Sequence, residues 1–470
     1  MSVYQPAPRL KDRFQLVLSS FLQQEGLPFS SVLSEERIQQ VFDEADVSFA
    51  KREEDPVYTP AVTLWAFLSQ VLFKNEQRSC LAAVSRVLVF LVAIGQKACS
   101  KNTGAYCRAR AKIPTAVIRQ LATEGAATAE KNLPEGLLWK GRRVKVADGF
   151  TVSMPDTVKN QEAYPQPATQ KPGVGFPLAR CVALFSLATG MALDLEIGPY
   201  QGKKTGETAL FRTMMARLEA GDIVLADCYY CSYFMIVLLT ELKVDFVVRL
   251  HQCRTADFGR GKKDHVVRWS RPPKPAWMDD ETYARMPESI EVREVQVRVP
   301  QPGFRPESFV VVTTLTNDKT YTADDIRDLF RKRWLVEQDI RAIKSTLGLD
   351  VLRCETPEMV RKEIWVGLLA YNLIRQTMLQ AALQADLAPR DLSFTHALQT
   401  VAASWQLMPV LSTEGQAAQI AAALEGLERP LVGRRPNRVE PRAVKRRPKP
   451  HDLLTKPRAE ARAELLGTKA

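Results

Sequence analysis

The sequence has little histidine and no set of cysteines that suits a zinc site. Its four histidines are scattered through 470 residues, and of eight cysteines only Cys228 and Cys231 stand close together. A zinc site needs a second pair at suitable spacing, and the sequence has none. We therefore expect reduced thiols in a cytoplasmic protein, with neither a zinc site nor a histidine-based triad.

The chain also lacks a hydrophobic run long enough to cross a membrane. The longest run, residues 81–95, is interrupted by Arg86, whereas a span needs about 20 apolar residues. The N-terminal residues lack the charged, apolar and small-residue pattern of a signal peptide. With 46% hydrophobic and 25% charged residues, the composition is typical of a globular protein. We expect no membrane partner.

The positive charge is concentrated near one end of the sequence. Residues 429–470 hold 13 Lys and Arg against 4 Asp and Glu, while the rest of the chain holds 52 against 49. This tail is rich in proline and poor in apolar residues, so it is predicted to be disordered. It is either a solubilising tail or an arm that lies along a polyanion.

The apolar pattern predicts four regions along the chain. Residues 1–135 indicate a helical N-terminal region that binds DNA, and residues 136–380 an α/β domain. Strands and helices in the order β-β-β-α-β-α-β predict a mixed sheet with packed helices. A β-rich insertion is expected at about 251–320, and a helical C-terminal region at 381–428, before the basic tail.

Two carboxylates are expected at the ends of buried strands. Asp148 follows the run Val-Lys-Val-Ala, and Asp227 follows Ile-Val-Leu-Ala. Acids at the carboxyl ends of strands are common in the active sites of open sheets. An Asp-Gly pair such as Asp148-Gly149 is also a favourable turn, which is the alternative explanation.

A third carboxylate, Glu337, stands among cations. Residues 330–344, FRKRWLVEQDIRAIK, contain no Gly or Pro and are predicted to form one helix. At about 100° per residue, Arg333, Arg341 and Lys344 fall on the same side as Glu337. The face is either solvated, with an Arg333–Glu337 pair worth a few tenths of a kcal/mol, or a place where a metal ion and phosphates meet.

Several blocks together resemble the family-four insertion-sequence transposases, the DDE group with a ribonuclease-H-like core. The blocks are VADGFTVSMPDT, IVLADCYY, FRKRWLVEQDIRAIK, TPAVTLWAFLSQV, NTGAYCRAR, KKTGETALFR and the basic tail. The third is similar to that family's Tyr-x2-Arg-x3-Glu-x6-Lys signature, with Phe330 in place of the tyrosine. Phe330 cannot supply the hydroxyl contact to a phosphate, although its ring can still pack.

The resemblance implies a role for each matching residue. Asp148, Asp227 and Glu337 would be the catalytic metal ligands, for Mg²⁺ with Mn²⁺ as a substitute, because hard cations prefer oxygen ligands. The phosphate and DNA contacts would be Arg333, Lys344, Arg341, Phe309, Arg108, Arg110 and Lys112. Phe309 would stack on a flipped base, with Trp269 a weaker candidate and an ordinary core role the alternative.

The resulting hypothesis is a DNA transposase. It would bind the ends of its mobile element as a homodimer, cleave phosphodiester bonds with divalent metal ions and join the 3′-hydroxyl ends to target DNA; a hairpin can lie between those steps in the family. One alternative is a metal-dependent nuclease of the same core without strand transfer. The other is a non-enzymatic DNA-binding protein derived from a transposase, which would need none of the three acids.

Overall fold

The computed structural model describes residues 10–24, 33–47, 57–259, 262–298, 308–429, 431–432 and 453–467. The chain divides into two compact units: one of residues 1–141, 188–193 and 338–433, the other of residues 142–187, 194–337 and 434–470. Most of the basic tail, and with it the predicted DNA-binding arm, lies outside the described residues. Near its end α16 (Arg458–Leu465) is helical, since its Ala, Glu, Arg and Leu residues favour a helix.

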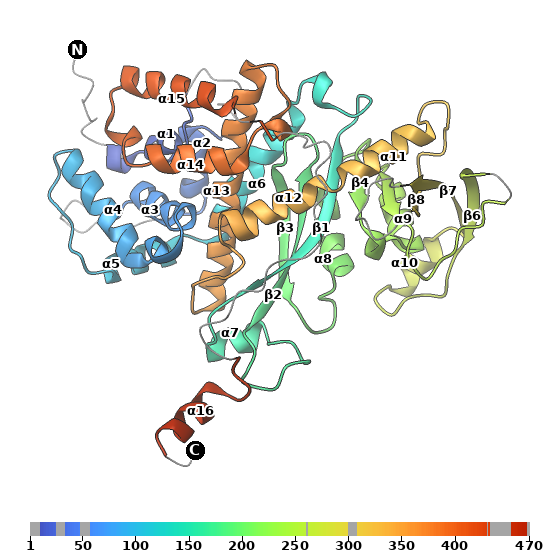
Figure 1. The fold of residues 1–470 in the computed structure, drawn as a ribbon, viewed down its shortest axis with the longest axis horizontal. Helices are drawn as coiled ribbons and strands as arrows, with labels where there is room; N and C mark the ends of the chain where they lie inside the picture. The colour runs from blue at the N-terminus through green and yellow to red at the C-terminus, as the bar shows by residue number, and fades with distance from the viewer. Residues whose placement is uncertain are drawn as a thin grey trace. The chain divides into compact units, whose positions relative to one another are not determined.

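The second of these units contains one mixed sheet of eight strands in the described residues, in the order β3-β2-β1-β4-β5-β8-β7-β6 (Figure 1). The strands are β1 (Val144–Ser153), β2 (Leu178–Ser186), β3 (Ala192–Pro199), β4 (Ile223–Ala226), β5 (Asp245–Arg249), β6 (Asp264–Ser270), β7 (Ser289–Arg298) and β8 (Ser308–Thr313). β4 runs parallel to β1 and to β5, and the pairs β1–β2, β5–β8, β8–β7 and β7–β6 are antiparallel. The predicted mixed sheet is confirmed, and the strands of region 251–320 continue it.

The helices between and after these strands are α7 (Val158–Ala163), α8 (Glu207–Met214), α9 (Tyr233–Glu241), α10 (Asp280–Arg285), α11 (Ala323–Lys332) and α12 (Leu335–Arg341), the last of which continues into the other unit. α8 and α9 stand where the sequence predicts them, whereas α7 and α10 were not predicted. α8 contacts β1 and β2, α9 contacts β5, and α11 contacts β5, β7 and β8. The central strand β4 is buried along its whole length, which explains its continuous apolar sequence.

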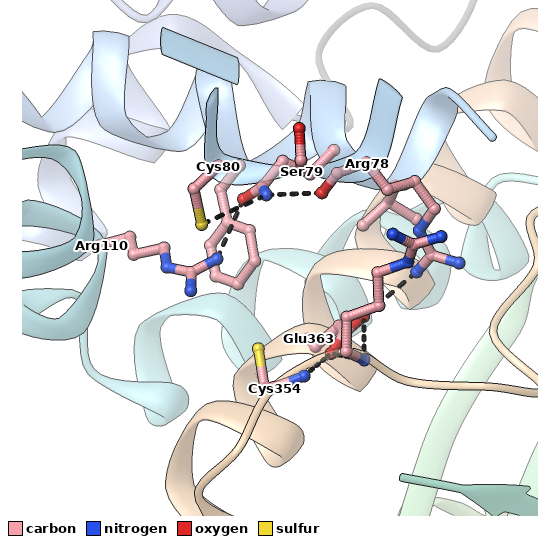
Figure 2. A pocket seen from close by; sticks show the side chains of 10 residues that line it. Arg78, Ser79, Cys80, Arg110, Cys354 and Glu363 are labelled. Carbon is pink, nitrogen blue, oxygen red and sulfur yellow. Dashed lines mark hydrogen bonds and ion pairs between the residues drawn. The ribbon is translucent and has the colours of Figure 1, made fainter. Parts of the chain in front are cut away.

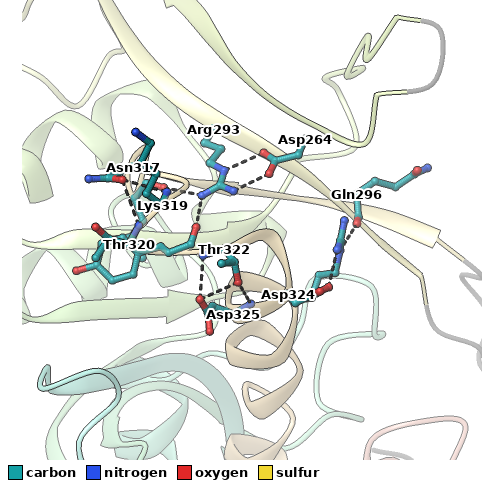
Figure 3. A network of polar contacts seen from close by, with 12 residues as sticks. Asp264, Arg293, Gln296, Asn317, Lys319, Thr320, Thr322, Asp324 and Asp325 are labelled. Carbon is teal, nitrogen blue, oxygen red and sulfur yellow. Dashed lines mark hydrogen bonds and ion pairs between the residues drawn. The ribbon is translucent and has the colours of Figure 1, made fainter.

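A polar network fixes the beginning of α11 (Figure 3). The buried Arg293 of β7 donates to both carboxylate oxygens of Asp264, at 2.8 and 2.6 Å, and to the carbonyl of Tyr321, at 2.5 Å. The next residue, Thr322, forms a capping box with Asp325 at the start of α11. Because a buried guanidinium is costly to separate from its carboxylate, this network holds the start of α11 against β6 and β7.

The prediction of a single helix over residues 330–344 is wrong. α11 and α12 are separated by Arg333 and Trp334, which form a turn. The amide of Arg333 donates to the carbonyl of Phe330 at 3.0 Å, and the carbonyl of Arg333 accepts from the amide of Val336, also at 3.0 Å. Such bonds between residues three apart wind the chain more tightly than an α-helix, so one continuous helical face does not exist.

The other unit is helical. In the described residues it contains α1 (Gln15–Ser20), α2 (Glu35–Glu44), α3 (Pro60–Leu72), α4 (Cys80–Ala93), α5 (Gly104–Lys112), α6 (Thr115–Lys131), α13 (Pro357–Gln384), α14 (Phe394–Ser404) and α15 (Thr413–Leu427). The long, largely buried α13 packs against α3, α6, α14 and α15. We expected 381–428 as a separate region, but its helices pack here with those of the N-terminal part. Nowhere in the described part of the chain is a helix both long and apolar enough to cross a membrane.

A buried ionic cluster stabilises the helical unit. The fully buried carboxylate of Asp339 accepts from Arg375 at 2.5 Å, from Arg390 at 2.7 Å and from the hydroxyl of Tyr371 at 3.1 Å. Arg375 and Tyr371 belong to α13, so one acid links the central helix to the segment before α14. Removing the acid would leave two guanidinium groups with little compensation away from water.

We predict that Asp339→Asn lowers the free energy of unfolding by about 3–5 kcal/mol, because it leaves buried positive charge uncompensated. Urea unfolding followed by far-UV circular dichroism measures the change. The matched control is Asp43→Asn on the exposed face of α2, which should change stability by no more than about 0.5 kcal/mol. Equal losses in the two variants would contradict the prediction.

Candidate active site

Asp148 and Asp227 follow the same paired positions of two parallel strands. In the register of β1 with β4, Val146 pairs with Leu225, and each acid comes two residues later along the chain. Asp148 lies within β1, whereas Asp227 comes directly after β4. The charge of Asp227 raises the pKa of Asp148, so the two carboxylates interact electrostatically. Their role as metal ligands stays a prediction.

One detail of the sequence prediction is wrong, since Asp148 does not end its strand. β1 continues to Ser153, paired with β2 alone, and Asp148 itself pairs with Ala183. Only the parallel pairing of β1 with β4 ends before Asp148, because the chain leaves β4 at Asp227. There the carboxylate of Asp227 accepts a hydrogen bond from the amide of Tyr229 at 2.9 Å. The Asp-Gly pair is consequently part of a strand, and the turn explanation does not hold.

Burial controls the protonation of both acids. The pKa of Asp148 is raised to about 6, chiefly by burial and also by the carboxylates of Asp227 and Glu207, while Arg333 and the amide of Gly149 act in the opposite direction. Burial likewise raises the pKa of Asp227, partly offset by the amide of Tyr229 and by Arg333. Negative charge at this place is therefore costly without a cation.

Arg333 lies between the carboxylates of Glu337 and Asp148. Its guanidinium lies 3.5 Å from Oδ2 of Asp148 and 3.5 Å from Oε1 of Glu337. These separations exceed those of good hydrogen bonds, so the contacts are electrostatic. Asp148 and Arg333 are 16% and 17% exposed, against 43% for Glu337, which places the positive charge in a partly dehydrated position between two carboxylates.

The donor set suits a hard divalent cation, although the acids do not converge on one point. Among the residues that the structure describes, no three His, Cys, Asp or Glu side chains are close enough to hold a metal ion together. The guanidinium of Arg333 stands between two of the three predicted ligands. Carboxylate oxygens are the ligands that Mg²⁺ and Mn²⁺ prefer, so the chemistry of the three acids suits such an ion.

A fourth acid, Glu207, belongs to the same place and escaped the sequence analysis. It begins α8 and lies across Gly149, where an added Cβ would stand 2.4 Å from its Cδ atom. Its position depends on the packing of α8 on β1, a tertiary contact that no local pattern reveals. The available signal was its place in the KKTGETALFR block.

The aromatic candidates for base stacking occupy different environments. The half-buried Phe309 of β8 has its ring 5.4 Å from that of Phe330, and the guanidinium of Arg249 lies 5.4 Å above it. Trp269 is 6% exposed, with Arg254 over its ring at 4.0 Å. Phe309 thus has a core contact as well as a partly exposed ring, and its contact with a base stays a prediction.

Two predicted phosphate contacts, Arg341 and Lys344, lie in the helical unit. Arg341 is exposed at the end of α12. Lys344 is half-buried in a π-helical turn, Ala342–Thr346. Such turns are rare and often mark functional sites. The contacts of Arg341 and Lys344 with phosphate stay predictions.

The predicted DNA contacts of α5 differ in exposure. Arg108 and Lys112 are exposed, whereas Arg110 is half-buried. Figure 2 shows Arg110 on the wall of a cavity of about 180 Å³, where it donates to Gln70 at 3.0 Å. The ring of Phe67 lies 5.3 Å from its guanidinium. Arg110 therefore has an internal role in the helical unit, and its contact with DNA stays a prediction.

Comparison with known proteins identifies related transposases. Residues 139–373 match the family model described as Transposase DDE domain. The chain is 24% identical over 362 residues to the transposase InsG for insertion sequence element IS4 of Escherichia coli strain K12, covering 73% of this chain and 76% of the relative. It is 37% identical over 82 residues, 17% of this chain and 21% of the relative, to the transposase for insertion sequence element IS421 of Escherichia coli.

Among solved structures, the piggyBac transposase in a synaptic complex with hairpin DNA aligns with 90% of this chain and 84% of its own, at 10% identity and a TM-score of 0.45. A likeness at that score decides nothing about this chain.

The α/β fold and the matched family model define an enzyme of the DDE class. The matched model spans half of the chain and contains Asp148, Asp227 and Glu337. The chain therefore belongs to the Transposase DDE domain family, and within it to the transposases of the IS4 type. It is a DNA transposase, and membership in this family implies DNA binding and dependence on divalent metal ions.

We predict that Asp148→Asn changes the pH dependence of stability in the absence of metal. Because the pKa of Asp148 is about 6 in the folded protein and about 3.9 in the unfolded chain, ionisation destabilises the fold as the pH rises through this range. Relative to Asp148→Asn, the wild type should lose roughly 1.4 kcal/mol between pH 5 and pH 7. Urea unfolding in EDTA tests this, and parallel pH curves for the two proteins would contradict it.

Proposed function

We propose that this transposase binds the ends of its own mobile element, cleaves phosphodiester bonds there and joins the freed 3′-hydroxyl ends to target DNA. The observation that supports the proposal is the pairing of Val146 with Leu225, two residues before Asp148 and Asp227, together with the contacts of Arg333 with Asp148 and Glu337. The five strands β3-β2-β1-β4-β5 with α8 and α9 support a ribonuclease-H-like core. The protein would act on DNA in the bacterial cytoplasm.

Asp148, Asp227 and Glu337 would hold Mg²⁺, with Mn²⁺ as a substitute. When bound, such ions lower the pKa of an attacking water and stabilise the leaving oxygen at phosphorus. The protein contributes the placement of these carboxylates and their partial removal from water, which strengthens their attraction for a cation. Arg333 would release the carboxylates on metal binding, which frees its guanidinium for a phosphate oxygen.

The remaining candidates would hold DNA. Lys344 and Arg341 would contact phosphates near the cleaved strand, and Phe309 would stack on a flipped base at the end of the element. Arg108, Arg110 and Lys112 of α5 would contact the end sequence. A homodimer in the DNA complex would offer one such site to each end of the element, because a two-fold dimer presents the same surface twice.

Replacing Asp148, Asp227 or Glu337 with alanine should each reduce cleavage by roughly 10³-fold or more, while binding of the element's ends changes little. The physical reason is that the acids serve the metal and repel phosphate, whereas DNA affinity comes from cations. Single-turnover cleavage of end DNA in Mg²⁺ and a gel-shift titration measure the two effects.

A thermal melt of each variant is the control for folding. A second assay, the conversion of pre-cleaved ends into strand-transfer products by the wild type, distinguishes a transposase from a nuclease. Substantial cleavage by folded Glu337→Ala would refute the assignment of Glu337. Failure of the wild type to join pre-cleaved ends would refute strand transfer.

A further inference from the structure

We propose that a pocket formed by α8, α9 and the loop before α10 binds one unpaired nucleotide of DNA, with the base against aromatic side chains and the phosphate on Arg212. This inference rests on the proposed function, because it takes DNA at the active site as the substrate. The pocket is separate from the stacking candidates that the sequence suggests, since neither Phe309 nor Trp269 lines it.

The pocket lies within the unit that contains the sheet and has a volume of about 270 Å³. Its lining includes Thr208 and Arg212 of α8, Phe234 of α9 and Trp277 of the loop before α10. Sites for drug-sized molecules are larger, at roughly 300–1,000 Å³. The pocket therefore suits a single flat ring system.

Two aromatic rings of the pocket are left partly in solvent. Tyr229 is 65% exposed and Trp277 is 39% exposed, although burying such a ring is a large source of stability. Phe234 packs edge-to-face against Trp277, with the ring centroids 6.3 Å apart and an angle of 89° between the planes, which orients the indole. Exposed aromatic rings of this kind are stacking surfaces for unpaired bases, because every base has a π-face.

Arg212 is a cation without an anionic partner. Its guanidinium lies 3.8 Å from the centre of the Trp277 ring. In the part of the chain that the structure describes, its side chain forms no ion pair and no hydrogen bond. Burial lowers the pKa of Arg212, and no acid opposes that shift. A guanidinium over a ring keeps its N–H donors at its edge, and these donors match the oxygens of a phosphate.

Tyr229 connects the pocket to the proposed active site. Its amide donates to the carboxylate of Asp227 at 2.9 Å, so one wall of the pocket stands two residues after a proposed metal ligand. A nucleotide held here would therefore belong to DNA bound at that site. Its base would leave the stack of the duplex, as bases do in enzymes that extrude a nucleotide.

The ordinary explanation for Arg212 and Trp277 is that their contact holds the loop before α10 against α8. A cation–π contact stabilises a fold modestly, and it accounts for this pair. It accounts neither for the exposed ring of Tyr229 in the same pocket nor for guanidinium donors that have no acceptor. The two explanations differ in one measurable respect, which is whether these side chains contribute to base-dependent affinity for single-stranded DNA.

The test is binding of the full-length protein in EDTA to a fluorescein-labelled strand of about eight thymidine nucleotides and to the same backbone without bases. Fluorescence anisotropy measures both affinities. Tyr229→Ala and Trp277→Ala should each lower affinity for the thymidine strand by roughly 5–100-fold and leave affinity for the abasic strand nearly unchanged. Phe176→Ala removes another exposed ring of the same unit, and as the matched control it should bind both strands as the wild type does.

The phosphate contact is tested with Arg212→Met, which keeps an apolar stem over Trp277 and removes the charge. This variant should weaken binding of both strands alike. It should also reduce the slope of log affinity against log salt concentration by about 0.7, the value for one phosphate contact with a single strand.

Thermal melts confirm that each variant is folded, and Tyr229→Ala keeps the test decisive if Trp277→Ala unfolds, because the tyrosine ring is mostly in solvent. Wild-type affinity of folded Tyr229→Ala for the thymidine strand, or an unchanged salt slope for folded Arg212→Met, refutes the nucleotide pocket. Such a result leaves the proposed function in place if the wild type still cleaves end DNA in Mg²⁺. Absence of that cleavage refutes the proposed function whatever the pocket binds.

Discussion

The placement of the Arg333 guanidinium between Asp148 and Glu337 is the interaction on which the site depends. One carboxylate belongs to the sheet and the other to α12, and the two are linked through a single positive charge. That link requires α11 to run along the sheet and to end in a tight turn at Arg333. The Arg293–Asp264 pair and the Thr322 capping box fix the start of the same helix (Figure 3). The position of the charge thus depends on the polar contacts that fix the start of α11.

The acids are held where ionisation is costly. Asp148, Asp227 and Glu207 all have a raised pKa, chiefly because burial removes water from their carboxylates. A buried carboxylate with a raised pKa does not stabilise the fold. Such groups cluster at functional sites, for example where a cation is to be bound. Arg333 supplies one positive charge in the metal-free protein. In the proposed mechanism a divalent ion takes that role, and the guanidinium becomes available to phosphate.

The sequence predicted the mixed sheet because strands depend on local pattern. Apolar β-branched runs before Asp148 and Asp227 specify β1 and β4, and their register pairs Val146 with Leu225, two residues before each acid. The prediction of one continuous helix over residues 330–344 was wrong because the argument from periodicity assumes α-helical geometry throughout. The tight turn at Arg333 contains no Gly or Pro that would reveal it in the sequence.

Features that depend on packing were not predictable in this way. Glu207 reaches the site only because α8 packs on β1 and residue 149 has no side chain. Arg110 looked like one of three basic residues on α5, yet the aromatic ring of Phe67 and the amide of Gln70 draw it into the helical unit. A single sequence carries no information on such neighbours.

The most direct test of metal binding between the two sheet acids is anomalous diffraction at the manganese edge from crystals soaked in Mn²⁺. We expect a peak about 2.1 Å from carboxylate oxygens of both Asp148 and Asp227, with the guanidinium of Arg333 displaced from Asp148. A fully occupied manganese peak that lies beyond coordination distance of Asp148, or an Arg333 that still bridges Asp148 and Glu337 in the metal-bound crystal, would contradict this mechanism.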